Sequence, residues 1–168
     1  MQKLYESLDS VRDRTALLMF ATTGLRRNEL FSLITDDIDF DKRMIVPGKN
    51  LRTKRSYVTF YNEEAERHLE KHLSNNDDGN EIFSIRARSI NRIFLRNLRK
   101  DGIENISPQD LRKWFAKEMR DGGVSGEHID AFCGRLPRSV RGKHYTDYSP
   151  SRLKEIYEKA DIKVLEGK

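Results

Sequence analysis

The amino-acid sequence predicts a mainly α-helical domain that contains one small antiparallel β element. Several stretches carry apolar residues at helical spacing and begin or end with helix-capping residues. Between them, residues 43–46 and 55–60 are typical of two short strands, and a polar loop joins these strands into a hairpin. The chain has 168 residues, enough for one domain with a hydrophobic core, so we expect residues 1–168 to form a single domain.

Three helices are expected around this hairpin in the N-terminal half. Residues 9–22 form the first helix, which Gly24 ends. Residues 28–38 continue as a second short helix. After the strands, residues 62–74 form a third helix, with Asn62 as its cap and two glutamates in its first turn.

The C-terminal half is predicted to be helical. Residues 86–100 form the clearest amphipathic helix, with arginines on one face and apolar residues on the other. A further helix begins at Ser107, where Pro108 takes the first helical position and Asp110 completes a capping box. Three more helical stretches are expected at 125–132, 138–145 and 151–160.

Charge divides the chain. The net charge is +5, but residues 1–84 carry a net of −2 and residues 85–168 a net of +7. A basic half indicates a polyanionic partner such as nucleic acid, although a charged solvated surface gives the same sum. The helix at 86–100 has six basic residues and no acidic one, which favours a phosphate backbone as its neighbour. Its basic face comprises Arg88, Arg92, Arg96 and Arg99.

The composition also excludes some classes of protein. No apolar run approaches the roughly 20 residues that span a bilayer, so we expect no membrane association. The charged N-terminus is unlike a signal peptide. A single cysteine, Cys133, excludes an internal disulfide and a thiolate zinc cluster. These features predict a cytoplasmic protein.

Two arginines lie at special points in the helices. Arg26 is at the turn between the first two helices, and Glu29 follows where it could pair with an arginine. Taken alone, Arg26 is more typical of a surface arginine after a helix cap. Arg112 lies one turn inside its helix among apolar neighbours, so we expect it to be partly buried. It then needs an anionic partner, which is either a protein carboxylate or a phosphate.

The other candidates lie in the hairpin loop and near the C-terminus. The loop carries Lys49, Arg52 and Lys54, and a lysine there can reach into a cleft and deliver a proton, although such charges are also common in soluble turns. Further along, Arg135 follows a glycine, and Tyr145 lies ten residues after it.

These groups, in this order, resemble the catalytic domain of tyrosine recombinases, the integrase family. The motifs are TGLRxxEL at 23–30, a hairpin lysine, LR within a helix, Gly-Arg, and a tyrosine about ten residues on. The resemblance covers about residues 10–160 and implies the DNA breaking-rejoining fold. The KHYT stretch at 143–146 and the arginine ten residues before its tyrosine look most like integrases of archaeal viruses and plasmids, including the spindle-shaped viruses.

The resemblance implies a role for each motif residue. The three arginines, Arg26, Arg112 and Arg135, stabilise the charge of the phosphodiester in its transition state. Tyr145 attacks the phosphate and is favoured over Tyr148, which adjoins the last helix. The products are a covalent 3′-phosphotyrosyl intermediate and a free 5′-hydroxyl.

Proton transfer and DNA contact fall to other residues. The hairpin lysine, Lys54 or alternatively Lys49, gives a proton to the 5′-oxygen. Gln109 stands where the family usually has histidine, and it can orient a phosphate but cannot exchange a proton near neutral pH. The residues expected to contact DNA are Lys49, Arg52, Arg88, Arg92, Arg96, Arg99, Arg138, Arg141 and Lys143.

The implied enzyme is a site-specific DNA recombinase that needs neither metal nor ATP nor another cofactor. Its partner is double-stranded DNA at attachment sites, on which the full-length protein forms a tetramer. Integrases usually carry a separate N-terminal domain that this sequence lacks, so we expect a fragment, or else a natural short form, that is monomeric or weakly dimeric alone. The apolar stripe of the last helix, Leu153, Ile156 and Tyr157, could dock onto a neighbouring protomer or fold back onto its own core.

Two other functions stay open at this point. A tyrosine-class DNA topoisomerase uses similar catalytic groups but acts as a monomer on one strand. A DNA-binding module of the same fold could have lost its activity, and Gln109 is the best support for that alternative.

Overall fold

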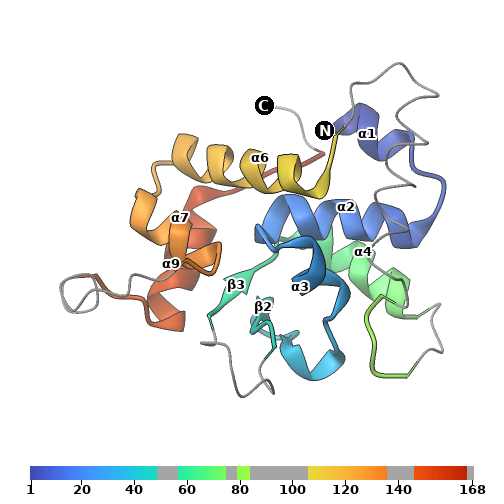
Figure 1. Cartoon of the computed structure of the whole chain (residues 1–168), viewed down its shortest axis with the longest axis horizontal. Helices are drawn as coiled ribbons and strands as arrows, with labels where there is room; N and C mark the ends of the chain where they lie inside the picture. The colour runs from blue at the N-terminus through green and yellow to red at the C-terminus, as the bar shows by residue number, and fades with distance from the viewer. Residues whose placement is uncertain (49–56, 75–78, 84–105, 136–145, 166–168) are drawn as a thin grey trace.

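The computed structural model describes residues 1–48, 57–74, 79–83, 106–135 and 146–165 (Figure 1). In this part of the chain, the mainly helical class with a small antiparallel sheet is confirmed. None of the described helices is both long and apolar enough to cross a membrane. The helices predicted at 86–100 and 138–145 lie outside the described residues. The described helices are α1 (Gln2–Glu6), α2 (Val11–Thr23), α3 (Arg27–Phe31), α4 (Glu63–Leu73), α6 (Pro108–Asp121), α7 (Gly126–Phe132) and α9 (Pro150–Ala160).

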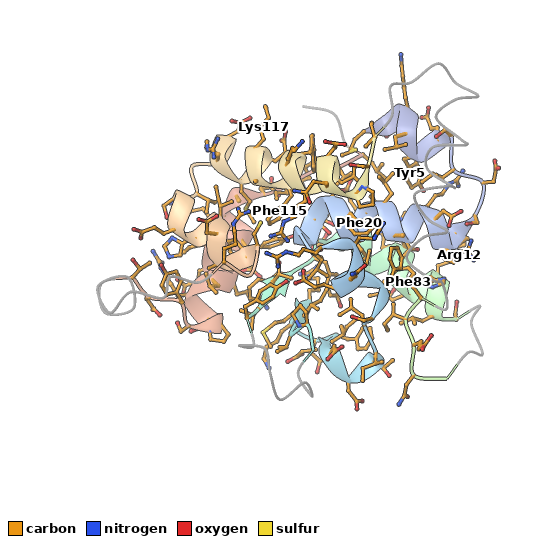
Figure 2. All side chains as sticks on the ribbon, in the orientation of Figure 1. Tyr5, Arg12, Phe20, Phe83, Phe115 and Lys117 are labelled. Atoms are coloured by element: carbon orange, nitrogen blue, oxygen red, sulfur yellow. The ribbon has the colours of Figure 1, made fainter. Side chains whose placement is uncertain are left out.

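Helix α2 is the central helix of the structure. Its Ser10 cap accepts a hydrogen bond from the Asp13 backbone N at 3.0 Å, and ten of its thirteen residues are buried. It packs against both α4 and α6 (Figure 1). In Figure 2, Phe115 of α6 lies on the side that faces α2, while Lys117 lies on the outer side. Since α2 is buried almost all round, it fixes the position of the turn that follows it.

The predicted helix caps are confirmed in two helices. The Asn62 side chain accepts a hydrogen bond from the Ala65 backbone N at 3.0 Å at the start of α4. At the start of α6, Asp110 N donates to Ser107 Oγ and Ser107 N donates to Asp110 Oδ2, which is the expected capping box. Each cap satisfies backbone N–H groups that have no partner within the helix.

The prediction of one helix over 28–38 is wrong beyond its first turn. Helix α3 ends at Phe31, and the backbone becomes extended at Ile34, which forms an isolated bridge with Glu81. Ile82 N also donates to Leu33 O at 3.0 Å. The apolar spacing resembled a helix, but hydrogen bonds to a segment far along the chain determine the local structure. A short 3-10 turn, Thr35–Asp37, follows.

The β element is a three-stranded antiparallel sheet with the order β1-β2-β3. The predicted hairpin is confirmed as the pairing of its second and third strands, whereas the two-residue first strand was not predicted. At the end of the hairpin, Thr59 Oγ1 donates to Thr23 O of α2 at 2.7 Å. The strands are β1 (Ile38–Asp39), β2 (Met44–Ile45) and β3 (Thr59–Phe60).

Helix α9 packs onto the protein's own core. Leu153 and Tyr157 are buried, and the Tyr157 hydroxyl donates to Thr22 O at 2.8 Å. The segment after α9 is tied down as well, because the Glu64 carboxylate accepts hydrogen bonds from the backbone N of Val164 and of Leu165 at 2.8 and 2.9 Å. The last helix was expected either to dock onto a neighbouring protomer or to fold back onto its own core, and in this structure it packs on its own core.

Candidate active site

Two glycine turns at helix ends carry two of the predicted arginines. Gly24 ends α2 with φ +63°, and Gly134 follows the cap of α7 with φ +65°. This left-handed backbone favours glycine, which has no Cβ to clash. Arg26 comes two residues after the first glycine and Arg135 directly after the second.

Each glycine also lies too close to an aromatic ring for a larger residue. A Cβ at Gly24 would be 2.5 Å from Cδ1 of Phe115, and one at Gly134 would be 2.6 Å from Cε1 of Tyr57. Both contacts are shorter than carbon atoms tolerate without movement. The path of each turn is therefore defined by its conformation and by the ring packed on it.

Arg112 connects the two turns. Its guanidinium Nη1 donates to Gly24 O, and its Nη2 donates to Cys133 O at 2.5 Å. Both carbonyls belong to the C-cap residues of helices α2 and α7. Helix C-termini carry carbonyls without intrahelical partners and a partial negative charge, so they suit a cation. One buried side chain thus cross-links the turns that carry Arg26 and Arg135.

The groups that accept hydrogen bonds from Arg112 differ from the predicted anionic partner. Arg112 was expected to be partly buried beside a carboxylate or a phosphate, and it is 4% exposed. Its direct acceptors are main-chain carbonyls, while the nearest carboxylate oxygen, Glu29 Oε2, is 4.0 Å from Nη1. Burial lowers the pKa of Arg112, but a guanidinium remains protonated in proteins.

Glu29 is the anchor of Arg26, and their predicted pairing is confirmed. Glu29 Oε1 accepts from Arg26 Nη1 at 2.9 Å, and Oε2 accepts from Arg26 N at 2.7 Å and from the Tyr57 hydroxyl at 2.9 Å. Burial by itself raises the pKa of Glu29, but these hydrogen bonds outweigh it and the pKa is lowered. The carboxylate, 7% exposed, is therefore charged at neutral pH.

Arg26 itself is only partly enclosed. Its side chain is 46% exposed. Burial acts to lower the pKa of Arg26, but the hydrogen bond and the charge of Glu29 outweigh it and raise that pKa. The guanidinium is fixed on one side by Glu29, and among the described residues no other side chain accepts a hydrogen bond from its remaining donors.

Arg135 has a carboxylate partner of a different kind. Its Nε and Nη2 donate to Oδ1 of Asp130 at 2.8 and 2.6 Å, and both side chains are 50% exposed. The backbone repeats the link, because Arg135 N donates to Asp130 O at 2.7 Å. This pair lies at the surface, where solvent weakens the attraction.

The three arginines gather around Cys133. Burial raises the pKa of the Cys133 thiol, while the charges of Arg112, Arg135 and Arg26 all act in the opposite direction. The cysteine is fully buried. Residues that lie far apart in the sequence thus form one cationic cluster.

The remaining predicted residues divide into described and undescribed ones. Gln109 is exposed in the first turn of α6, three residues before Arg112. Tyr148 lies before α9 with its ring centroid 5.9 Å from that of His128, and its hydroxyl oxygen is buried. The following fall outside the described residues: Lys49, Arg52, Lys54, Arg88, Arg92, Arg96, Arg99, Arg138, Arg141, Lys143 and Tyr145.

Two residues of this cluster were missed in the sequence. Tyr57 gave one signal, since the alternation in the second predicted strand places it on the same face as Thr59, which binds the end of α2. Asp130 gave none, because a single carboxylate in a short helix is typical of any solvated surface. Both residues orient arginines that the sequence did identify.

Comparisons with known proteins place this cluster in context. The sequence matches the phage integrase family over residues 1–152. The tyrosine recombinase XerC of Corynebacterium glutamicum is 30% identical over 161 residues, which cover 89% of this chain and 51% of the relative. XerA of Saccharolobus solfataricus is 28% identical over 125 residues, covering 74% of this chain and 42% of the relative. The chain spans about half the length of the curated relatives it matches.

Solved structures share the fold. The crystal structure of XerA recombinase superposes with a TM-score of 0.72 and 23% identity, covering 96% of this chain and 61% of that one. The XerH recombinase bound to its difH substrate superposes with a TM-score of 0.68 and 16% identity, covering 92% and 49%. The arrangement of helices around the small sheet is therefore that of recombinases.

Proposed function

The chain belongs to the phage integrase family, and we propose that it is the catalytic part of a site-specific DNA recombinase. The observation that carries this proposal is the cross-link made by Arg112. Through it, the two helix ends that carry Arg26 and Arg135 are tied to one buried side chain, and each of these arginines is about half exposed. A group of partly exposed guanidinium cations suits a phosphodiester, whose own charge repels nucleophiles.

In this proposal, Tyr145 is the nucleophile. A tyrosine hydroxyl has a pKa near about 10 and attacks only when its anion and the phosphate charge are stabilised. The Tyr145 oxygen loses its proton to solvent and forms a 3′-phosphotyrosyl bond, while the bond between phosphorus and the 5′-oxygen breaks. Lys54, or else Lys49, donates a proton to this leaving oxygen, which becomes a 5′-hydroxyl. Because the covalent bond conserves the phosphodiester, the reverse attack rejoins DNA without ATP. The enclosed hydroxyl of Tyr148 supports the choice of Tyr145.

The arginines divide the electrostatic work in this proposal. Arg26 and Arg135 donate hydrogen bonds to the non-bridging oxygens of the phosphate. The buried Arg112 contributes its positive charge and holds the two turns together. Gln109, at the exposed start of α6, orients the phosphate without exchanging a proton. Removing one well-placed donor of this kind costs about 10²–10³ in rate.

The partner in this proposal is double-stranded DNA at attachment sites. The basic C-terminal half, with a net charge of +7, supports it. So do the solved neighbours, because the Tn1549 integrase is in complex with transposon DNA and the XerH recombinase is bound to its difH substrate. Assembly into a tetramer on DNA, and an origin in an archaeal virus or plasmid, are further parts of the proposal. We also propose that the chain is one domain of a longer integrase, as the greater length of its relatives supports.

Capture of a covalent adduct tests this function. The target site is unknown, so the probe is a pool of nicked duplexes with randomised arms, from which bound strands cannot be rejoined. Protein–DNA adducts that survive denaturation are isolated and sequenced. We expect enrichment of a site with wild-type protein and none with Tyr145→Phe, while Tyr148→Phe behaves as wild type.

Other outcomes separate the alternatives. If DNA is retained only before denaturation, the chain is a binding module and the proposal fails. If the adduct forms but two enriched sites never exchange strands in the longer protein, a topoisomerase explains the chemistry better. Adduct formation that persists in Tyr145→Phe and is lost in Tyr148→Phe would reassign the nucleophile.

A further inference from the structure

We propose that Tyr57 is a positioning residue of this site: its hydroxyl fixes the carboxylate that orients Arg26, and its ring supports the turn that carries Arg135. The proposal rests on the proposed function, because it assigns Tyr57 a task in orienting the two exposed arginines. Neither the sequence motifs nor the family motif residues single out this tyrosine. Tyr57 is the first described residue after the hairpin loop.

The hydroxyl completes the shell of donors around Glu29. Oε1 is used by Arg26 Nη1, while Oε2 is shared between Arg26 N at 2.7 Å and Tyr57 Oη at 2.9 Å. A carboxylate buried to this degree needs donors on both oxygens to remain charged and fixed. The Tyr57 hydroxyl is the donor that comes from a different element, so it ties the carboxylate to the sheet side of the site.

The ring acts on the second turn. Three of its carbon atoms lie within 3.0 Å of the position a Cβ would take on Gly134. The ring therefore occupies the space that a side chain on Gly134 would fill, directly before Arg135. Tyr57 is itself buried, and interior packing permits little movement between such groups.

The backbone of Tyr57 is fixed in turn. Two residues on, Thr59 donates its hydroxyl to Thr23 O at the end of α2. That carbonyl is one residue before the Gly24 turn. One short segment thus contacts the end of α2, the Glu29 carboxylate and the Gly134 turn, and Arg112 bridges the same turns from α6.

These contacts give Tyr57→Phe a signature that a purely structural tyrosine lacks. Within the described part of the chain, the groups that face Glu29 are Arg26 from its own turn, Tyr57 from the sheet side and Arg112 from α6. Cys133, at the end of α7, lies beside the arginines. Apart from burial, which acts in the other direction, the hydrogen bonds of Arg26 and Tyr57 lower the pKa of Glu29. Loss of the Tyr57 hydroxyl should therefore raise that pKa.

The test compares Tyr57→Phe with Tyr157→Phe. The control also removes a buried hydroxyl that donates one hydrogen bond, but its acceptor is Thr22 O of α2 and not the Glu29 carboxylate. The first readout is the titration of the Glu29 carboxyl carbon by NMR in the free protein. The second is the single-turnover rate of adduct formation on the enriched nicked duplex, measured against pH, together with the affinity for that duplex.

We expect Tyr57→Phe to raise the pKa of Glu29 and to shift the acidic limb of the pH–rate profile to higher pH. At neutral pH its rate should fall about tenfold, which is typical of a lost hydrogen bond to a charged group. DNA affinity should stay within about twofold, since a positioning defect acts on the transition state. Tyr157→Phe should change neither the Glu29 titration nor the rate.

An unchanged Glu29 titration in Tyr57→Phe, or a rate loss no larger than that of Tyr157→Phe, would overturn the assignment. Failure of the proposed function looks different: wild-type protein would then form no adduct at all. The Glu29 titration would still decide whether Tyr57 fixes the carboxylate, because that measurement needs no DNA.

Discussion

The turn with Gly24 and Arg26 and the turn with Gly134 and Arg135 share a left-handed glycine, an exposed arginine and a carbonyl that Arg112 binds. They differ in the carboxylate beside the arginine. Glu29 is buried and accepts from two residues, whereas Asp130 is half exposed and accepts from Arg135. The two arginines are similarly exposed, so their own solvent contact does not distinguish them.

The comparison separates two ways to orient a cation. The buried carboxylate keeps its charge without solvent and fixes Arg26 from several directions. The exposed one is screened by water, so it contributes little energy and leaves Arg135 freer to move. We infer that Arg26 is in place before DNA binds and that Arg135 adjusts to the phosphate.

Arg112→Ala should have the largest effect, because it removes what the two turns share. The Gly24 and Cys133 carbonyls would lose their buried donor, and Glu29 would lose a nearby charge. The free energy of unfolding should fall by about 3 kcal/mol or more, as measured by urea denaturation. Lys113→Ala, which breaks the exposed pair with Asp110, is the control and should change little. Similar losses in the two variants would contradict the cross-link.

Substitution of Gly24 or Gly134 should cause the next largest loss of stability, and comparison with a glycine in open space should show how much the aromatic contacts contribute. Gly24→Ala drives a Cβ into Phe115, which is fully buried, and Gly134→Ala drives one into Tyr57. Gly123→Ala isolates the backbone cost, because Gly123 has φ +82° and no described residue has an atom within 4 Å of the position of its Cβ. We expect the control to lose about 1 kcal/mol of stability and the other two to lose more. Equal losses in all three would mean that the aromatic contacts do not matter.

Neutralising the buried carboxylate of Glu29 should cost more stability than neutralising the exposed carboxylate of Asp130. Glu29→Gln should lower stability by about 2 kcal/mol at neutral pH, and Asp130→Asn by no more than about 0.5. Thermal unfolding over a pH series checks the sign. The lowered pKa of Glu29 contributes stability above the ordinary glutamate value of 4.5, and this contribution is lost as the pH falls through the folded-state value. The gap between wild type and Glu29→Gln should therefore narrow in acid, and a constant gap would contradict a charged Glu29.

Tyr148→Phe should have the smallest effect. Its buried hydroxyl has no hydrogen-bond partner among the described residues, so its removal deletes no described interaction. Stability should change by less than about 0.5 kcal/mol, and adduct formation should match that of wild type. A clear loss of adduct would indicate a role for this hydroxyl in the reaction.

Local rules predicted five of the described helices, α2, α4, α6, α7 and α9, and predicted the long-range contacts poorly. The caps at Asn62 and Ser107 are decided within four residues, so the sequence reveals them directly. The helix predicted over 28–38 failed because Ile34 pairs with Glu81, a contact that no local pattern encodes. The link from Glu64 to Val164 spans 100 residues and left no signal either.

The candidate site shows the same division. Arg26, Arg112 and Arg135 could be identified because each lies in a motif with its own residue pattern. Their mutual arrangement could not, since it depends on carbonyls that every residue possesses. The acceptors of Arg112 are the main chains of Gly24 and Cys133. Side-chain identity does not distinguish those acceptors before the helices are assembled.

The central claim is that the two turns present Arg26 and Arg135 to one phosphate. A double-mutant cycle on the single-turnover rate of adduct formation tests it, with Arg26→Lys, Arg135→Lys and the double variant, so that activity remains measurable. If both arginines stabilise the same transition state, the double variant should be within about tenfold of the slower single variant. If the two losses simply multiply, the arginines act independently and the claim is contradicted.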